Sequence, residues 1–143
     1  MSIVESIIDY ISSLDCMKDF NSIVNVNYLA DEEDSFSIEE IPSEVIVKKY
    51  LDGSSKRQFK FVFTSREPYG VEVLNQLNNS NFYENFTKEI EENNLNNILP
   101  VLDNNLTPCS IKVISSAYLV NIDENNDTCM YQINLNFNYI KER

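Results

Sequence analysis

The stretch Val45–Pro68, which reads VIVKKYLDGSSKRQFKFVFTSREP, decides the fold of this 143-residue chain. Its second half alternates, with Phe59, Phe61 and Phe63 on one side of an extended backbone and polar residues between them. An Asp-Gly pair separates this segment from the apolar run before it, and that combination predicts a β-hairpin. Because three phenylalanines on one face need a covering layer, we expect the hairpin to lie at the centre of a sheet buried on one side.

The same stretch carries much of the positive charge of an acidic chain. The chain holds 11 Lys and Arg against 23 Asp and Glu, for a net charge of −12. We hypothesise that five basic residues of the stretch form a protein–protein interface: Lys48, Lys49, Lys56, Arg57 and Arg66. The acidic residues of a neighbouring copy, within 31–34 or 84–92, would attract them, and such head-to-tail contacts generate rings or filaments. An ordinary mixed-charge surface is the alternative reading.

The composition argues against several other partners and settings. A net charge of −12 disfavours tight binding to DNA or RNA and to an anionic membrane surface. No apolar run reaches the length of a membrane span, and the first residues lack the pattern of a secretory signal. Cys16, Cys109 and Cys129 stand far apart, which fits neither a disulfide framework nor a zinc site, so a reducing cytoplasm is the simplest setting.

The rest of the chain supplies helices and further strands around the hairpin. Helices are expected over residues 2–15, 71–77 and 81–93. Strands are expected over residues 23–29, 36–42 as a short edge, and 111–122 with 128–140 as a second hairpin. The loop 93–108 should anchor the core through Leu95, Ile98, Leu99, Val101 and Leu102. We therefore expect one α+β domain over residues 1–143, with a mixed, mostly antiparallel sheet flanked by two or three helices.

A search for catalytic chemistry finds no specific motif. The absence of histidine excludes Ser-His and Cys-His pairs, and two glycines cannot form a phosphate-binding loop. The segment Asp123–Asp127 begins like a calcium loop, but Thr128 and Asn134 stand where that loop needs glycine and glutamate, so we expect a turn. A carboxylate pair or a Ser–Lys arrangement remains open. We expect no enzyme activity, no cofactor and no metal.

Six short motifs follow one another in a fixed order between residue 35 and the end of the chain. They are Tyr50-Leu51-Asp52-Gly53, Arg57-Gln58-Phe59, Ser65-Arg66-Glu67, Phe82-Tyr83-Glu84, Leu99-Pro100 and Tyr131-Gln132-Ile133. In this order and spacing, the chain resembles a family of small proteins from the tail-gene clusters of phages of Gram-positive bacteria, the minor capsid or tail terminator proteins. The segment 87–94 departs from that family, which often has tryptophan in this helix, because this chain has none.

The resemblance implies a sheet flanked by helices and a structural role. Tail terminators assemble as a ring, usually hexameric, on the end of a completed tail tube, where they stop polymerisation and present the docking surface for the head. The implied partners are further copies of the chain and the tail tube protein, with a sheath protein and the head/neck connector as further candidates. The implied location is the head-proximal end of a virion tail or a tail-like bacteriocin, after assembly in the host cytoplasm. A head-tail connector or head-completion protein is the alternative, and a small ligand-binding α+β domain is a more distant one.

Overall fold

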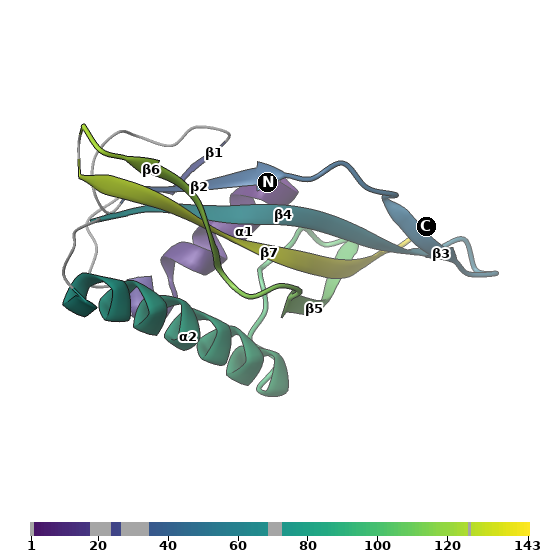
Figure 1. Cartoon of the computed structure of the whole chain (residues 1–143). Helices are drawn as coiled ribbons and strands as arrows, with labels where there is room; N and C mark the ends of the chain where they lie inside the picture. The colour runs from purple at the N-terminus through teal and green to yellow at the C-terminus, as the bar shows by residue number, and fades with distance from the viewer. Residues whose placement is uncertain (1, 18–23, 27–34, 69–72, 126) are drawn as a thin grey trace.

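Two long strands form the axis of the molecule. Strands β4 (Ser55–Pro68) and β7 (Thr128–Lys141) pair antiparallel along their whole length of 14 residues each (Figure 1). The predicted hairpin of Val45–Pro68 is confirmed, since β3 (Ile46–Lys49) pairs with the start of β4 across a tight turn. Only β4 is central in the sheet, because among the described strands β3 pairs with β4 alone and lies at an edge. The computed structural model describes residues 2–17, 24–26, 35–68, 73–125 and 127–143.

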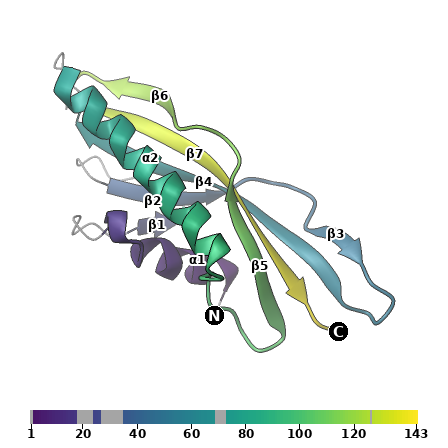
Figure 2. The ribbon, with the colours of Figure 1, turned by 90° about the horizontal axis from the view of Figure 1, so that it is seen from below.

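The remaining elements complete a single α+β domain, as predicted. The further strands are β1 (Val24–Val26), β2 (Ser35–Glu40), β5 (Leu106–Val113) and β6 (Tyr118–Asp123). The helical elements are α1 (Ile3–Ser12), the short 3₁₀ helix η1 (Asp15–Met17) and α2 (Val73–Leu95). The seven described strands form one sheet in which only β1 and β2 are parallel. Both α-helices lie on the same face of this sheet (Figure 2).

Each long strand changes its neighbour along its length. Strand β4 pairs with β2 over one half and with β3 at its other end, while β7 pairs first with β6 and then with β5. The predicted single arm 111–122 is therefore wrong, because the chain leaves the ladder between β5 and β6. There the Ser115 Oγ accepts a hydrogen bond from the Asn134 backbone N–H at 3.1 Å, which holds the bend against β7.

The core lies between the helices and one face of the sheet. The pairs Phe59–Phe137, Phe61–Leu135 and Phe63–Ile133 place all six side chains on that face, and all six are buried. The rings of Phe36, Phe63 and Phe86 stack in sequence, with centroids 5.6 and 5.0 Å apart. This stack joins β2, β4 and α2, so the alternation read from the sequence directly organises the core.

The opposite face of the sheet is polar and has no helix over it in the described part of the chain (Figure 1). Four amide side chains of β7 lie on it, and each is half-buried: Gln132, Asn134, Asn136 and Asn138. They pair across from Thr64, Val62, Lys60 and Gln58 of β4. One face of the central strands is therefore apolar and covered, and the other is polar.

The first helix follows the sequence closely. The Ser2 Oγ accepts a hydrogen bond from the Glu5 backbone N–H at 3.1 Å, which confirms Ser2 as the N-cap. Ile7 and Ile11 are fully buried under the sheet. The strand predicted over 23–29 is described only at β1, and the acidic run 31–34 lies outside the described residues.

Three other local predictions need correction. The two helices predicted over 71–77 and 81–93 are one continuous helix, α2, because the polar run around Asn81 does not interrupt it. Strand β2 is not an edge strand, since it lies between β1 and β4. Among the predicted core anchors of segment 93–108, only Leu99 and Leu102 pack against the core. Leu95, at the end of α2, is exposed, and so are Ile98 and Val101 in the loop that follows.

Candidate functional site

The tip of the β3–β4 hairpin is built by local hydrogen bonds. The Tyr50 N–H donates to the Ser54 carbonyl at 2.9 Å, and the Asp52 carboxylate accepts from both the N–H and the hydroxyl of Ser54. These bonds hold the pKa of Asp52 below its usual value. Gly53 has a φ of +91°, a conformation that favours glycine, and a Cβ there would lie 2.7 Å from the Cδ of Arg143. The turn is therefore specified by its own residues and by the chain terminus packed on it.

Four of the five predicted interface residues gather at this end of the sheet. Lys48 and Lys49 are exposed on β3, and Lys56 and Arg57 are half-buried at the start of β4. Lys48 lies directly opposite Lys56 in the ladder. Like charges in that position destabilise a strand pair, so an acidic partner would relieve an unfavourable contact.

The structure does not bring Arg66 to this surface. It lies at the other end of β4, is only 8% exposed, and its guanidinium donates to the Thr128 hydroxyl at 3.4 Å. Nine residues of extended strand separate it from Arg57, a distance of about 30 Å. Arg66 is therefore part of the buried half of the sheet and is not part of the cluster at the hairpin tip.

Two basic residues from the end of the chain join the cluster instead. Lys141 pairs with Ser55, which on its other side pairs with Lys49, and Arg143 packs over Gly53. We call residues 45–57 together with 141–143 the basic end. It holds six of the 11 Lys and Arg of the chain but only two of the 23 Asp and Glu. Sequence alone could not reveal this, because it depends on the register between β4 and β7.

The basic end also exposes apolar side chains. Among the described residues, 12 large apolar side chains are exposed, and nine of them fall into two groups. The first group lies on the basic end: Val45, Val47, Tyr50 and Leu51. The second lies on β6 and the bend before it: Ile114, Tyr118, Leu119, Val120 and Ile122. Exposed apolar groups gathered in this way mark surfaces for protein partners.

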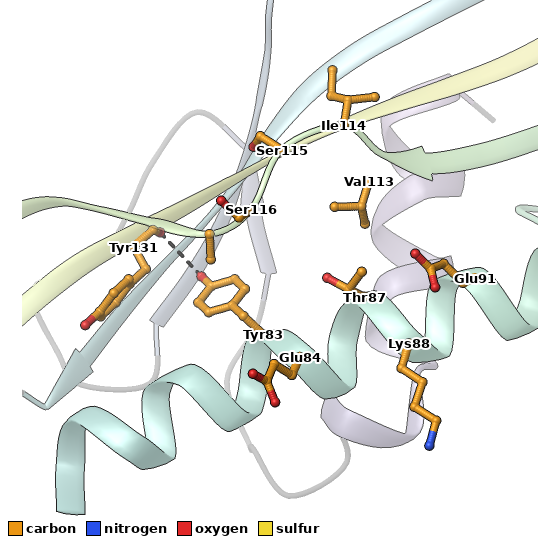
Figure 3. Close-up of a pocket in the computed structure, with 11 residues that line it drawn as sticks. Tyr83, Glu84, Thr87, Lys88, Glu91, Val113, Ile114, Ser115, Ser116 and Tyr131 are labelled. Carbon is orange, nitrogen blue, oxygen red and sulfur yellow. Dashed lines mark hydrogen bonds between the residues drawn. The ribbon is translucent and has the colours of Figure 1, made fainter. Parts of the chain in front are cut away.

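A groove opens next to the second group, between α2 and the bend that joins β5 to β6 (Figure 3). Its volume is about 740 Å³, and we call it the α2 groove. Helix α2 lines it with Tyr83, Glu84, Thr87, Lys88 and Glu91, and the opposite wall is residues 113–117 with Tyr131. In Figure 3 the Lys88 ammonium points away from the opposite wall, whereas Glu91 extends toward Val113. The groove therefore faces α2, which carries Glu84, Lys88 and Glu91, with a wall that includes the apolar side chains of Val113, Ala117 and Tyr131.

Buried hydrogen bonds fix the walls of the groove. The Tyr83 hydroxyl is hydrogen-bonded to the Ser65 hydroxyl and donates to the Tyr131 carbonyl at 3.4 Å. Burial raises the pKa of Tyr83, which keeps its hydroxyl neutral. At the other end of α2, the Asn94 side-chain oxygen accepts from the Ile111 N–H at 2.9 Å, and its amide donates to the Ile111 carbonyl. Asn94 thus pairs with the outer edge of β5 as a neighbouring strand would.

The acidic segment 84–92, predicted as a contact for the basic residues, divides between two roles. Both carboxylate oxygens of Glu89 accept backbone N–H groups of η1, from Asp15 at 2.6 Å and from Cys16 at 3.0 Å. Glu84 and Glu91 instead line the α2 groove and are exposed. Of the four glutamates in the segment, Glu84 and Glu91 therefore lie in the groove, where an incoming cation can reach both, and Glu92 is exposed outside it.

The cysteines lie in three different environments. Cys109 is exposed, Cys16 is half-buried, and Cys129 is fully buried. Burial, with the nearby Glu89 carboxylate, raises the pKa of Cys16 from its ordinary value of 9.0 to about 12. Burial, with Glu67, raises that of Cys129 to about 11. Both thiols therefore stay protonated near neutral pH, and Cys109 is the accessible one.

Among the described residues, no helix has the length and apolarity needed to cross a membrane.

Comparisons with protein-family models and with curated proteins find no relative of this chain. The resemblance to tail terminators therefore rests on the motifs of the chain itself.

Proposed function

We propose that this protein is a structural assembly protein that caps the tail tube of a phage or a phage-tail-like particle. Copies of the chain close into a ring, expected to be hexameric, on the head-proximal end of the completed tube. The ring stops further addition of tube subunits and presents the surface on which the head or neck docks. The chain performs this role by binding other proteins, without catalysis and without a cofactor.

The observation that carries the proposal is the basic end. It places exposed Val47, Tyr50 and Leu51 beside a cluster of lysines and arginines in a chain of net charge −12. In both Figure 1 and Figure 2 it extends away from the helices, at the far end of the β4–β7 pair. A protruding end that carries apolar and basic groups suits contact with an acidic protein surface. The motif Tyr50-Leu51-Asp52-Gly53, part of the resemblance to tail terminators, forms its turn.

The test is a tube-length assay with the tail tube protein of the particle that this chain is proposed to cap. Tube protein polymerises with and without the purified chain, and negative-stain electron microscopy measures the lengths and inspects the ends. We expect shorter tubes with density at one end. The variant Lys48→Glu/Lys49→Glu should lose this effect, whereas K60E/K112E, which reverses as much charge on the polar sheet face, should keep it. Tubes of unchanged length with bare ends would refute the proposal.

A head-tail connector remains the alternative role in the same class, because it would use a similar ring. Localisation on purified particles separates the two roles. A tail terminator is present on tails made without heads, whereas a head-completion protein is present on filled heads made without tails. Immunogold labelling of both preparations distinguishes these outcomes.

The α2 groove favours one further candidate, a small-ligand-binding domain. Its volume of about 740 Å³ lies within the range of ligand pockets. Its Glu84 and Glu91 carboxylates would select a cationic ligand. Measuring the melting temperature of the protein in the presence of a panel of polyamines and amino acids tests this candidate. A shift that Glu84→Gln/Glu91→Gln abolishes would support it.

A further inference from the structure

We infer that the α2 groove receives the basic end of a second copy of this chain. This inference rests on the proposed function, because it identifies the contact through which the ring closes. One copy contributes the β3–β4 turn, and the next contributes the wall of α2 with the bend between β5 and β6. The contact is between side chains of a protruding turn and a concave surface.

The two surfaces match in shape and polarity. The turn presents Leu51, which is fully exposed, with Val47 and Tyr50 beside it. The groove offers Val113, Ala117 and Tyr131 on the wall opposite α2, and Ile114 on the same wall is 51% exposed. A groove of about 740 Å³ has room for several side chains of this size. Burying these groups against one another removes apolar surface from water on both copies.

The two surfaces also carry opposite charge. Lys48 and Lys49 flank the turn, and Lys56 lies opposite Lys48. Glu84 and Glu91 are seven residues apart on α2, which is two helical turns, so both line the same side of the groove. Lys88 lies between them, but its ammonium points away from the opposite wall (Figure 3). Docking would bring the lysines to these carboxylates and relieve the Lys48–Lys56 repulsion. Residues 31–34, the other acidic segment, lie outside the described residues.

Backbone pairing between edge strands is a less suitable contact. Strands β3 and β6 are both at an edge of the sheet, but each is interrupted by a bulge at an exposed valine, Val47 in β3 and Val120 in β6. Bulges disrupt the regular ladder that a neighbouring strand would extend. The lysines on β3 also oppose strand addition, because charged side chains on an edge strand disfavour pairing with another chain. Docking of side chains into the groove needs no continuous ladder, and it places the β3 lysines against acidic side chains.

The placement of the two surfaces makes the contact intermolecular. Strand β3 lies beyond β4, whereas the groove lies on the side of β7 and α2, and both Figure 1 and Figure 2 show β3 well away from α2. A turn therefore docks in the groove of another copy. Because the two contacting surfaces differ, each copy can insert its turn into one neighbour and accept the turn of another in its groove. Repeating this contact produces a closed ring or an open filament.

A charge-swap experiment with the full chain tests the inference. The turn variant is Lys48→Glu/Lys49→Glu, and the groove variant is Glu84→Lys/Glu91→Lys. Sedimentation velocity at low salt measures self-association of each variant alone and of an equimolar mixture. Each variant alone should associate at least about tenfold more weakly than the wild type, because like charges then face each other. The mixture should regain assemblies of the wild-type size, since each turn meets a groove of opposite charge.

Two controls separate the groove from general effects of charge and folding. The variant Glu92→Lys/Glu124→Lys makes the same charge change at exposed positions outside the groove, and it should associate like the wild type. The variant Leu51→Asp changes only the turn and should weaken association without altering α2. Circular dichroism confirms that each variant is folded. Salt at about 0.5 M should weaken the wild-type assembly, because it screens the charge contacts.

The outcomes distinguish this contact from the proposed function. A mixture that fails to restore assembly, or a wild type that stays monomeric up to about 1 mM at low salt, overturns the inference. A groove variant that self-associates normally but no longer shortens tubes identifies the tube protein as the occupant, and this also overturns it. If the mixture of variants restores assembly but the chain does not shorten tubes, the contact is supported and the tail-terminator role is refuted. If the chain shortens tubes but the charge swap does not restore assembly, the role is supported and the contact is refuted.

Discussion

The two halves of the β4–β7 strand pair contrast sharply, although the same two strands form both. In the half under the helices, Phe61 and Phe63 are fully buried and the Phe36–Phe63–Phe86 stack fills the core. At the basic end, the same strand carries Lys56 and Arg57, and the neighbouring turn exposes Leu51. The alternating pattern continues through both halves, but only one has helices to cover it. The comparison indicates that stability is concentrated in the covered half. We propose that the other half contributes the turn that contacts a partner.

The largest effect should come from the core of the covered half. Phe63→Ala removes the central ring of a stack of three, so we expect it to lower the free energy of unfolding by about 3–5 kcal/mol. Urea unfolding followed by circular dichroism measures this change. The matched substitution at the basic end, Leu51→Ala, should change stability by less than about 0.5 kcal/mol, because the side chain is already in water. Equal losses for the two variants would contradict the division into halves.

A smaller loss of stability should appear at alkaline pH, and it should also arise from residues of the covered half. The pKa of Cys16 is about 12 and that of Cys129 about 11 in the folded chain, both above the ordinary thiol value of 9.0. Above pH 9 the unfolded thiols lose protons while the folded ones retain them, so protons are released on unfolding and stability falls as pH rises toward 12. Urea midpoints at pH 7.5 and 10 measure the loss. The variant Cys16→Ala/Cys129→Ala should lose less between the same two pH values, and an unchanged loss would exclude the thiols as its source.

The sequence was sufficient for the central hairpin because its signals are local. Alternation at Phe59, Phe61 and Phe63 and the turn at Asp52-Gly53 depend only on neighbouring residues. The same holds for Ser2 as the cap of α1. The sequence predicts two helices where α2 is continuous, because the polar run around Asn81 has weak helical propensity. Packing of Phe86 and Ile90 overrides that propensity. The exposure of Leu95 and Val101 likewise depends on tertiary packing, which apolar character does not reveal.

The candidate site was only partly accessible from the sequence for a related reason. Lys48, Lys49, Lys56 and Arg57 are close in sequence, so their clustering follows from the hairpin itself. Lys141 and Arg143 join them through a register that joins segments more than 80 residues apart. Arg66 belongs to the same strand but lies at its other end. The α2 groove combines three distant segments, residues 83–91, 113–117 and 131, so no local pattern could indicate it.

The most direct test of head-to-tail assembly is a disulfide cross-link between the turn and the groove. The variant carries Leu51→Cys and Ile114→Cys in a Cys109→Ser background, because Cys109 is the exposed native thiol. Mild oxidation at low salt, followed by non-reducing electrophoresis, should give a ladder of covalent oligomers that ends at the size of the closed ring. Variants in the same background that carry only one of the two introduced cysteines should give no ladder. A double variant that yields only monomers and dimers would contradict the account. A chain that inserts its turn into one neighbour and accepts the turn of another must link more than two copies.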